Sequence, residues 1–384
     1  MLGIGEDEMT PNKLPFPEGI IAFQTMFPDE RACEQYLFSM RHPNGFVCET
    51  CGATKYYEKK DLKIVQCPNH HLTSLTAGTI MHRTKQPLQT WFWAAYFIST
   101  HTPGISAVQF QKHLQITNYE PAFQLLHKMR SALVAPDRDS LSGVIEMDET
   151  YIKNSNQDKS IIIGAIEVVE RKITPTSKHQ GPRLLEKRPQ VAARLRLKVI
   201  PDETAVSFLD FTTKNVLRGS IIHTDGDPSY NGLVGLGYDH RPKVQGKGKS
   251  AVYGLDHIHR AFSNLKTWLS GTHHDAVLPK HMQAYCNEFV YRHNRRENPW
   301  AAFNRCLGLG TQAEAWPEYL TLYRAGETGG WMHPNPRADA AMYEKLLEAA
   351  NTASMDPLAN WMEEHKEEIQ ATLRKAMDPR RIAP

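Results

Sequence analysis

The stretch VIEMDETYI, residues 144–152, decides the fold class of this chain, because it is typical of a β-strand that ends in acidic residues. A β-branched run, SIIIGAIEVVE at 160–170, predicts a central strand, and RLRLKVI at 194–200 predicts a third. A helical pattern follows at 203–216, and another strand-like run begins at residue 220 and stops at Thr224. This order predicts an α/β domain with a mixed sheet covered by helices.

Acidic side chains lie near the ends of two of these predicted strands. Strand alternation places Glu146 and Asp148 on one face of the first strand and Glu149 on the other. Asp225 lies where a later strand ends in a glycine turn. Mg²⁺ is usually held by one or two carboxylates together with water and substrate phosphate. Since Asp-Gly is also a common turn signal, each acid alone would suggest a surface turn.

If the two aspartates bind a metal, the helical stretch DHIHRAFSNLKTWL at 256–269 should supply the third ligand, yet it contains no glutamate. At 3.6 residues per turn, His259 shares a face with Lys266, whereas Asn264 points nearly opposite to Lys266. An imidazole binds Mn²⁺ better than Mg²⁺, and an amide oxygen is a hard neutral ligand. Helical geometry therefore favours His259 over Asn264.

Four residues near the N-terminus have the spacing of a structural zinc site. Cys48 and Cys51 are followed, after fifteen residues, by Cys67 and His70, and His71 could replace His70. Four such ligands complete a tetrahedral Zn²⁺ site with no open position. Because so short a module has little core of its own, we expect Zn²⁺ binding to supply its folding free energy.

Helical patterns fill residues 85–135, and two of the helices are separated near residues 116–118. This pair is compatible with a helix-turn-helix, or with simple packing in a small helical domain. Basic islands lie at 241–249 and 292–296, although cations also suit a helix C-terminus. The net charge of +3 does not by itself announce a nucleic-acid partner. The candidate phosphate contacts are Lys128, Arg130, Lys243, Lys247, Lys249, Arg292, Arg295 and Arg296.

The 384 residues are enough for two or three domains. We expect a zinc ribbon with a leading helix at 19–80, a helical region at 85–135, a catalytic domain at 140–297 and a partly helical extension at 298–384. No apolar run approaches the ~20 residues that span a bilayer. The first residues lack a basic segment followed by an apolar one, which predicts a cytoplasmic protein without a signal peptide or a membrane partner.

Together these motifs resemble the zinc-ribbon transposases of bacterial insertion sequences. The resemblance covers residues 20–297, in the stretches GFVCETCG, TAGTIMHRTKQPLQTWFWA, EMDETYI, HTDGDPSYNGL, HRAFSNLKTWLSGTHH and LPKHMQAYCNEFVYRHNRR. It implies an RNase H-like catalytic domain, with Asp148 and Asp225 as the first two acids of a DDE-type Mg²⁺ or Mn²⁺ site. It also implies Lys266 as the basic residue that accompanies the third ligand.

The third position departs from the glutamate that is usual in the family. Some members are described as having asparagine there, so the resemblance gives a slight preference to Asn264, while helical geometry favours His259. Either residue removes one negative charge from the site. Metal affinity would then depend more on the phosphates of bound DNA.

The implied function is transposition. A transposase binds the terminal inverted repeats of its element in double-stranded DNA, hydrolyses a strand at each end and joins the freed 3′-hydroxyl to target DNA. Because two ends are joined in one complex, we expect a homo-oligomer that acts at the bacterial nucleoid. Two alternatives use the same residues: a zinc-ribbon DNA-binding protein with an inactive catalytic domain, and a metal-dependent nuclease without strand transfer.

Overall fold

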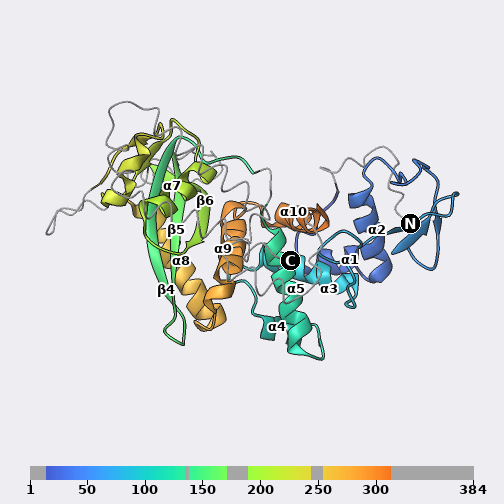
Figure 1. Ribbon diagram of the computed structural model, residues 1–384. Coiled ribbons are helices and arrows are strands. Elements are labelled where there is room, and N and C mark those ends of the chain that lie inside the picture. The colour runs from blue at the N-terminus through green and yellow to red at the C-terminus, as the bar shows by residue number, and fades with distance from the viewer. Residues whose placement is uncertain (1–13, 135–137, 171–188, 244–253, 313–384) are drawn as a thin grey trace, which may run out of the picture. The chain divides into compact units, whose positions relative to one another are not determined.

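The computed structural model describes residues 14–134, 138–170, 189–243 and 254–312 (Figure 1). The chain divides into two compact units. The described part of the first unit comprises residues 14–134 together with 287–312, and the second unit lies between them in the sequence. Within the described ranges, no helix combines the length and apolar character that crossing a bilayer requires.

A small three-stranded antiparallel sheet forms the N-terminal ribbon of the first unit. Its strands are β1 (Tyr57–Glu58), β2 (Ile64–Gln66) and β3 (Leu72–Ser74), in the order β1-β2-β3. The sheet buries only a few side chains, which are Phe46, Cys48, Leu62, Val65 and Cys67. So small a core agrees with a module that depends on bound metal for its stability.

Helices make up the rest of the first unit. The helices α1 (Ile20–Met26) and α2 (Glu30–Arg41) precede the ribbon, and the Asp29 side chain caps α2 by accepting the Ala32 N–H at 2.9 Å. After the ribbon come α3 (Leu88–Thr100), α4 (Ala107–His113) and α5 (Tyr119–Ala132). The α4–α5 pair is broken at residues 114–118, close to the predicted break.

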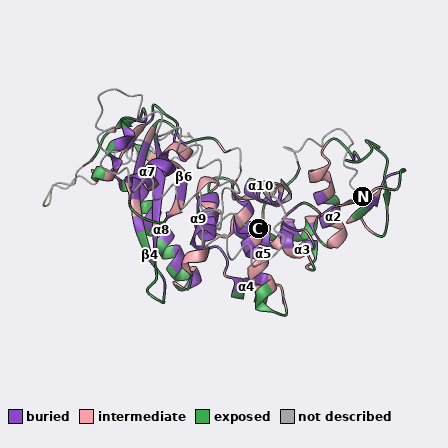
Figure 2. Ribbon diagram, in the orientation of Figure 1, coloured by how far each residue is buried: buried purple, intermediate pink, exposed green. Residues whose placement is uncertain are grey.

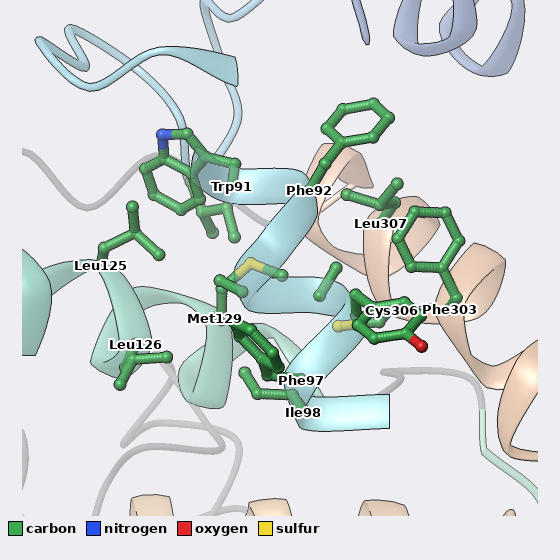
Figure 3. Close-up of a cluster of buried hydrophobic side chains, with 14 of the residues drawn as sticks. Trp91, Phe92, Phe97, Ile98, Leu125, Leu126, Met129, Phe303, Cys306 and Leu307 are labelled. Atoms are coloured by element: carbon green, nitrogen blue, oxygen red, sulfur yellow. The ribbon is translucent and has the colours of Figure 1, made fainter. Parts of the chain in front are cut away.

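The core of this unit is completed by a distant segment, α10 (Pro299–Gln312), which follows α9 (Pro279–Asn294). Figure 3 shows Phe303, Cys306 and Leu307 of α10 beside α3. The rings of Phe92 and Phe303 lie 6.1 Å apart. The sequence predicted a partly helical extension at 298–384. Residues 299–312 form α10, which packs with the N-terminal helices, and the remainder lies outside the described residues.

A five-stranded mixed sheet forms the second unit, in the order β6-β5-β4-β7-β8. The strands β4 (Val144–Lys153), β5 (Lys159–Glu170) and β6 (Gln190–Ile200) are antiparallel neighbours. The short strands β7 (Ile221–His223) and β8 (Asp239–His240) extend the sheet from β4 in parallel. This mixed sheet confirms the predicted α/β class.

Helices cover both faces of this sheet, and Figure 2 shows its central strands as buried. On one face, α7 (Ala205–Asn215) and the 3₁₀ helix η1 (Pro228–Leu233) share a hydrophobic core with the odd-numbered residues of β4. On the other face, α8 (Asp256–His273) packs against β4 and β5. The even-numbered residues of β4 near its middle, Glu146 and Asp148, therefore face α8.

Candidate functional site

Three carboxylates converge at the centre of the mixed sheet. Asp148 lies on β4, and Asp225 lies just beyond β7, the parallel neighbour of β4 in which His223 pairs with Glu146. One oxygen from each of Asp148, Glu149 and Asp225 lies within 4.8 Å of the other two. Hard carboxylate oxygens at this separation are suitable ligands for a divalent cation.

The chain holds Asp225 in place through the turn that follows β7. Gly226 adopts a φ of 94°, a conformation that glycine reaches without steric cost. The Thr224 hydroxyl is fully buried and lies 2.9 Å from His240 Nε2. The Asp227 N–H donates to Asp225 Oδ1 at 3.0 Å, so one carboxylate oxygen of Asp225 is already oriented by the backbone.

Glu149 is a member of this cluster that strand alternation did not predict. It approaches from the α7 and η1 side, where the Tyr230 hydroxyl donates to its Oε2 at 2.7 Å. Burial raises the pKa of Glu149 to about 7; the bond from Tyr230 opposes this, and the charges of Asp148 and Asp225 add to it. The available sequence signal was its place directly after Asp148.

The Asp148 carboxyl is buried more completely than that of Glu149. Burial raises its pKa, while the contact with His259 acts in the opposite direction and Asp225 adds to the rise. Asp148, the half-buried Glu149 and the exposed Asp225 repel one another when they are ionised. A divalent cation held among them would remove that repulsion, so the donor set fits Mg²⁺ or Mn²⁺.

Of the two candidates for the third position, His259 contacts one of the acids, Asp148. His259 Nε2 lies 2.8 Å from Asp148 Oδ2. Asn264 is exposed on the other flank of α8, so this placement favours His259, and the choice between the two residues stays a prediction. The reason is the buried stripe of α8, which fixes the rotation of the helix through Ile258, Ala261, Phe262, Leu265, Trp268 and Leu269. Lys266 is exposed, and it lies on the same side of α8 as His259.

Glu146 contacts the beginning of α8 and was not predicted to have a role. Its Oε2 accepts the N–H groups of His257 at 2.8 Å and Ile258 at 3.0 Å, and its Oε1 lies 2.8 Å from His257 Nδ1. Burial alone would raise the pKa of Glu146, but the bonds from His257 and Ile258 outweigh it and lower the pKa below its usual value.

At the ribbon, three thiols and one imidazole converge. The ligand atoms of Cys48, Cys51, Cys67 and His71 all lie within 4.8 Å of one another. The Sγ atoms of Cys51 and Cys67 are 3.7 Å apart, and His71 Nδ1 is 3.6 Å from Cys67 Sγ. Ligands about 2.3 Å from a tetrahedral Zn²⁺ lie about 3.8 Å from one another. The four side chains therefore fit structural zinc.

The imidazole that joins the three thiols is that of His71, the alternative that the sequence left open beside the predicted His70. His70 has a φ of 66° and an exposed side chain, and its Nδ1 lies 3.4 Å from Gln66 Nε2. The left-handed residue turns the chain after the Cys67 knuckle, and the next side chain then points at the thiols. Spacing alone could not distinguish the two histidines.

Two predicted phosphate contacts are structural instead. Arg130 is fully buried, and its Nε donates to Glu288, itself fully buried, at 2.6 Å. Arg292 Nη1 donates to the carbonyls of His101 at 3.1 Å and Thr102 at 2.6 Å. The Arg292 bonds hold the end of α3, and the Arg130 guanidinium is buried against Glu288 of α9. Both predictions are therefore corrected.

The other predicted contacts have varied positions. Lys128 is half-buried, and burial lowers its pKa. Lys243 Nζ donates to the Gly254 carbonyl at 2.8 Å. Arg295 lies 4.1 Å above the ring of Tyr291, and Arg296 is exposed. The remaining two, Lys247 and Lys249, lie outside the described residues.

Family comparisons agree with this geometry. Residues 140–294 match the family model described as the ISXO2-like transposase domain, and residues 28–69 match the transposase zinc-ribbon domain. No curated protein matches the chain. The fold, the acidic cluster and these matches define a transposase preceded by a zinc ribbon. The chain belongs to the zinc-ribbon transposase family of insertion sequences, which the sequence had indicated.

Proposed function

We propose that this chain is an active DNA transposase, which cleaves the ends of an insertion sequence and joins their 3′-hydroxyls to target DNA. The observation that carries the proposal is the convergence of Asp148, Asp225 and Glu149, with carboxylate oxygens within 4.8 Å of one another, in a domain of the transposase family. Hydrolysis and joining are both in-line displacements at a phosphodiester, so one site serves both.

Asp148 and Asp225 would hold Mg²⁺ or Mn²⁺ at this site. The bound ions supply Lewis-acid stabilisation of the attacking and leaving oxygens of the phosphodiester. His259 orients Asp148 through their 2.8 Å contact and is our candidate for the third position. Lys266, exposed on the same side of α8, is placed to bind a phosphate of the DNA.

The DNA-binding assignments are also part of this proposal. The ribbon and the α4–α5 pair would recognise terminal inverted repeats, and α4 exposes Val108, Gln109, Lys112 and His113. A helix-turn-helix also consists of two helices joined by a short turn, and its second helix binds in the major groove of DNA. Joining two ends requires at least two copies of the chain, acting at the nucleoid in the cytoplasm.

The test is cleavage and joining of a labelled terminal-repeat duplex with Mg²⁺ or Mn²⁺. We expect Asp148→Asn and Asp225→Asn to abolish both products. Asp239→Asn is the matched control, because Asp239 is an exposed acid on the same sheet that pairs with Arg241. DNA binding without any cleavage would overturn the proposal in favour of an inactive binding protein. Nicks without strand-transfer product would leave a nuclease.

A second comparison tests the third position. Because imidazole suits Mn²⁺ better than Mg²⁺, we expect the wild type to cleave faster with Mn²⁺. His259→Glu adds a hard carboxylate and should narrow the difference between the two ions. His259→Ala should lower cleavage at least about 10-fold, as loss of a ligand or of its partner does. Asn264→Ala should leave cleavage unchanged, and a loss in that variant would contradict the assignment.

A further inference from the structure

We propose that Glu146 is a positioning residue, whose carboxylate fixes the first turn of α8 so that His259 meets Asp148. The inference rests on the proposed function for the role of that site. It concerns a residue outside the carboxylate cluster, because among the described residues the cluster consists of Asp148, Glu149 and Asp225.

The first argument is how the N-terminus of α8 is capped. The N-cap of α8 is Leu255, which has no side chain able to accept a hydrogen bond. The first N–H groups of a helix have no partner within the helix and need one from outside. Glu146 provides it from another element, since one of its oxygens accepts the N–H groups of both His257 and Ile258. A carboxylate also interacts favourably with the positive end of the helix dipole.

The second argument is a matched pair of contacts. Glu146 and Asp148 are two residues apart on one face of β4, and His257 and His259 are two residues apart on α8. Each carboxylate lies 2.8 Å from one of the two imidazoles. Along a strand, two residues span about 6.6 Å. The buried stripe sets the rotation of α8, and the two contacts together set where its first turn lies along β4.

The third argument is the close approach of α8 to the sheet beside these contacts. Gly164 of β5 pairs with Asp148 across the β4–β5 ladder. A Cβ atom at Gly164 would lie 2.8 Å from Phe262 Cε1 and 2.9 Å from Ile258 Cδ1. The helix therefore lies directly on the backbone next to Asp148, so a small displacement of its first turn would separate His259 from that carboxylate.

The cost of burying Glu146 supports a specific role. Its side chain is 6 % exposed, and a buried carboxylate is unfavourable unless it is fully hydrogen-bonded. A capping residue that served stability alone would need no charge in the protein interior. The three bonds to α8 satisfy the carboxylate and transmit its position to the helix.

The experiment compares Glu146→Ala with Glu146→Gln in the full-length chain. We would measure Mn²⁺ affinity by electron paramagnetic resonance and the imidazole nitrogen chemical shifts of His259 in metal-free protein. A residue that orients a metal ligand typically contributes about 10- to 100-fold in metal affinity. We expect a loss of that size in Glu146→Ala with a changed His259 signal. Glu146→Gln should rescue both, because its amide oxygen still accepts the two N–H groups.

Glu167→Ala is the matched control. Glu167 is another buried carboxylate of the same sheet, and it accepts the Ser142 N–H at 2.8 Å and pairs with Arg194. We expect it to lower thermal stability while leaving Mn²⁺ affinity and the His259 signal as in the wild type. Equal losses in Glu167→Ala and Glu146→Ala would overturn the proposal, because they would show a general effect of stability.

A second variant covers the case in which Glu146→Ala does not fold. Glu146→Asp keeps the charge and shortens the side chain by one methylene, so its carboxylate no longer reaches α8. A wild-type His259 signal in this variant would overturn the positioning role, and a changed signal would support it. Because the signal is recorded without metal or DNA, it tests Glu146 even if strand cleavage is never observed.

Discussion

At the zinc site, backbone conformation chooses between two neighbouring histidines. His71 lies with Cys48, Cys51 and Cys67, whereas His70 is exposed. We expect His71→Ala to lose bound Zn²⁺ and the ribbon fold with it, because the metal supplies much of the folding free energy of such a module. His70→Ala should retain one Zn²⁺ per chain. Metal analysis of the two purified variants checks this, and zinc retained in His71→Ala but lost in His70→Ala would reverse the assignment.

The Glu149 carboxyl predicts a pH dependence of stability in the metal-free protein. Its pKa is raised from 4.5 to about 7, so between these values the folded state binds more protons than the unfolded state. The stabilisation is therefore complete below pH 4.5 and is lost as the pH rises through about 7. Glu149→Gln cannot lose a proton there, so its free energy of unfolding should fall less over the same range.

Urea denaturation of both proteins at a series of pH values measures this difference. When Mn²⁺ is added above pH 7, the wild type should gain more stability than Glu149→Gln, since in the wild type the ion also compensates the charge that has appeared on Glu149. Parallel pH profiles for the wild type and Glu149→Gln would show that the carboxyl titrates at its ordinary value.

At the scale of elements, the packing of α8 against the sheet depends on the absence of a side chain at Gly164. A methyl group at Gly164 would overlap Phe262, Ile258 and Leu197. We expect Gly164→Ala to cost about 1–3 kcal/mol in the free energy of unfolding, the usual range for overpacking. It should also move His259 away from Asp148 and reduce cleavage.

The control for this prediction lies on the same helix. A Cβ atom at Gly271 of α8 would have nothing within 4 Å, so Gly271→Ala should stabilise the helix by up to about 1 kcal/mol. Urea denaturation compares the two variants. Equal stability of Gly164→Ala and the wild type would mean that α8 can shift on the sheet without losing free energy of unfolding. It would contradict a fixed position of α8.

The sequence predicted the elements of the site better than their contacts. Local periodicity was enough to locate β4, β5, β6 and α8, and to show that His259 shares a face with Lys266. The partners of Glu146 are backbone N–H groups, which leave no mark on the pattern of side chains. Glu149 joins the cluster because Tyr230 and the turn after β7 bring Asp225 to it, and alternation within one strand cannot show this.

At the scale of the whole molecule, local sequence patterns also fail to show which distant segments pack together. The cations Arg130 and Arg292 were predicted to bind DNA because charge is visible in a sequence while burial is not. Arg130 instead pairs with Glu288, which is 158 residues away in the chain. The segment 299–312 carried no decisive local signal, yet it completes the core of the first unit. Contacts of this kind form between segments that are far apart in the sequence, so a local sequence pattern does not predict them.

Phe303 is therefore the residue through which this long-range packing is best tested. It is fully buried, and its ring lies near those of Phe23, Phe27 and Phe92. We expect Phe303→Ala to destabilise the first unit by about 3–5 kcal/mol, while the exposed neighbour Arg305→Ala changes stability by less than about 0.5 kcal/mol. Hydrogen exchange should show faster exchange in α3 and α5 with unchanged protection in β4 and β5. Faster exchange in β4 and β5 as well would mean that the two units unfold together, and unchanged exchange in α3 would remove α10 from the core.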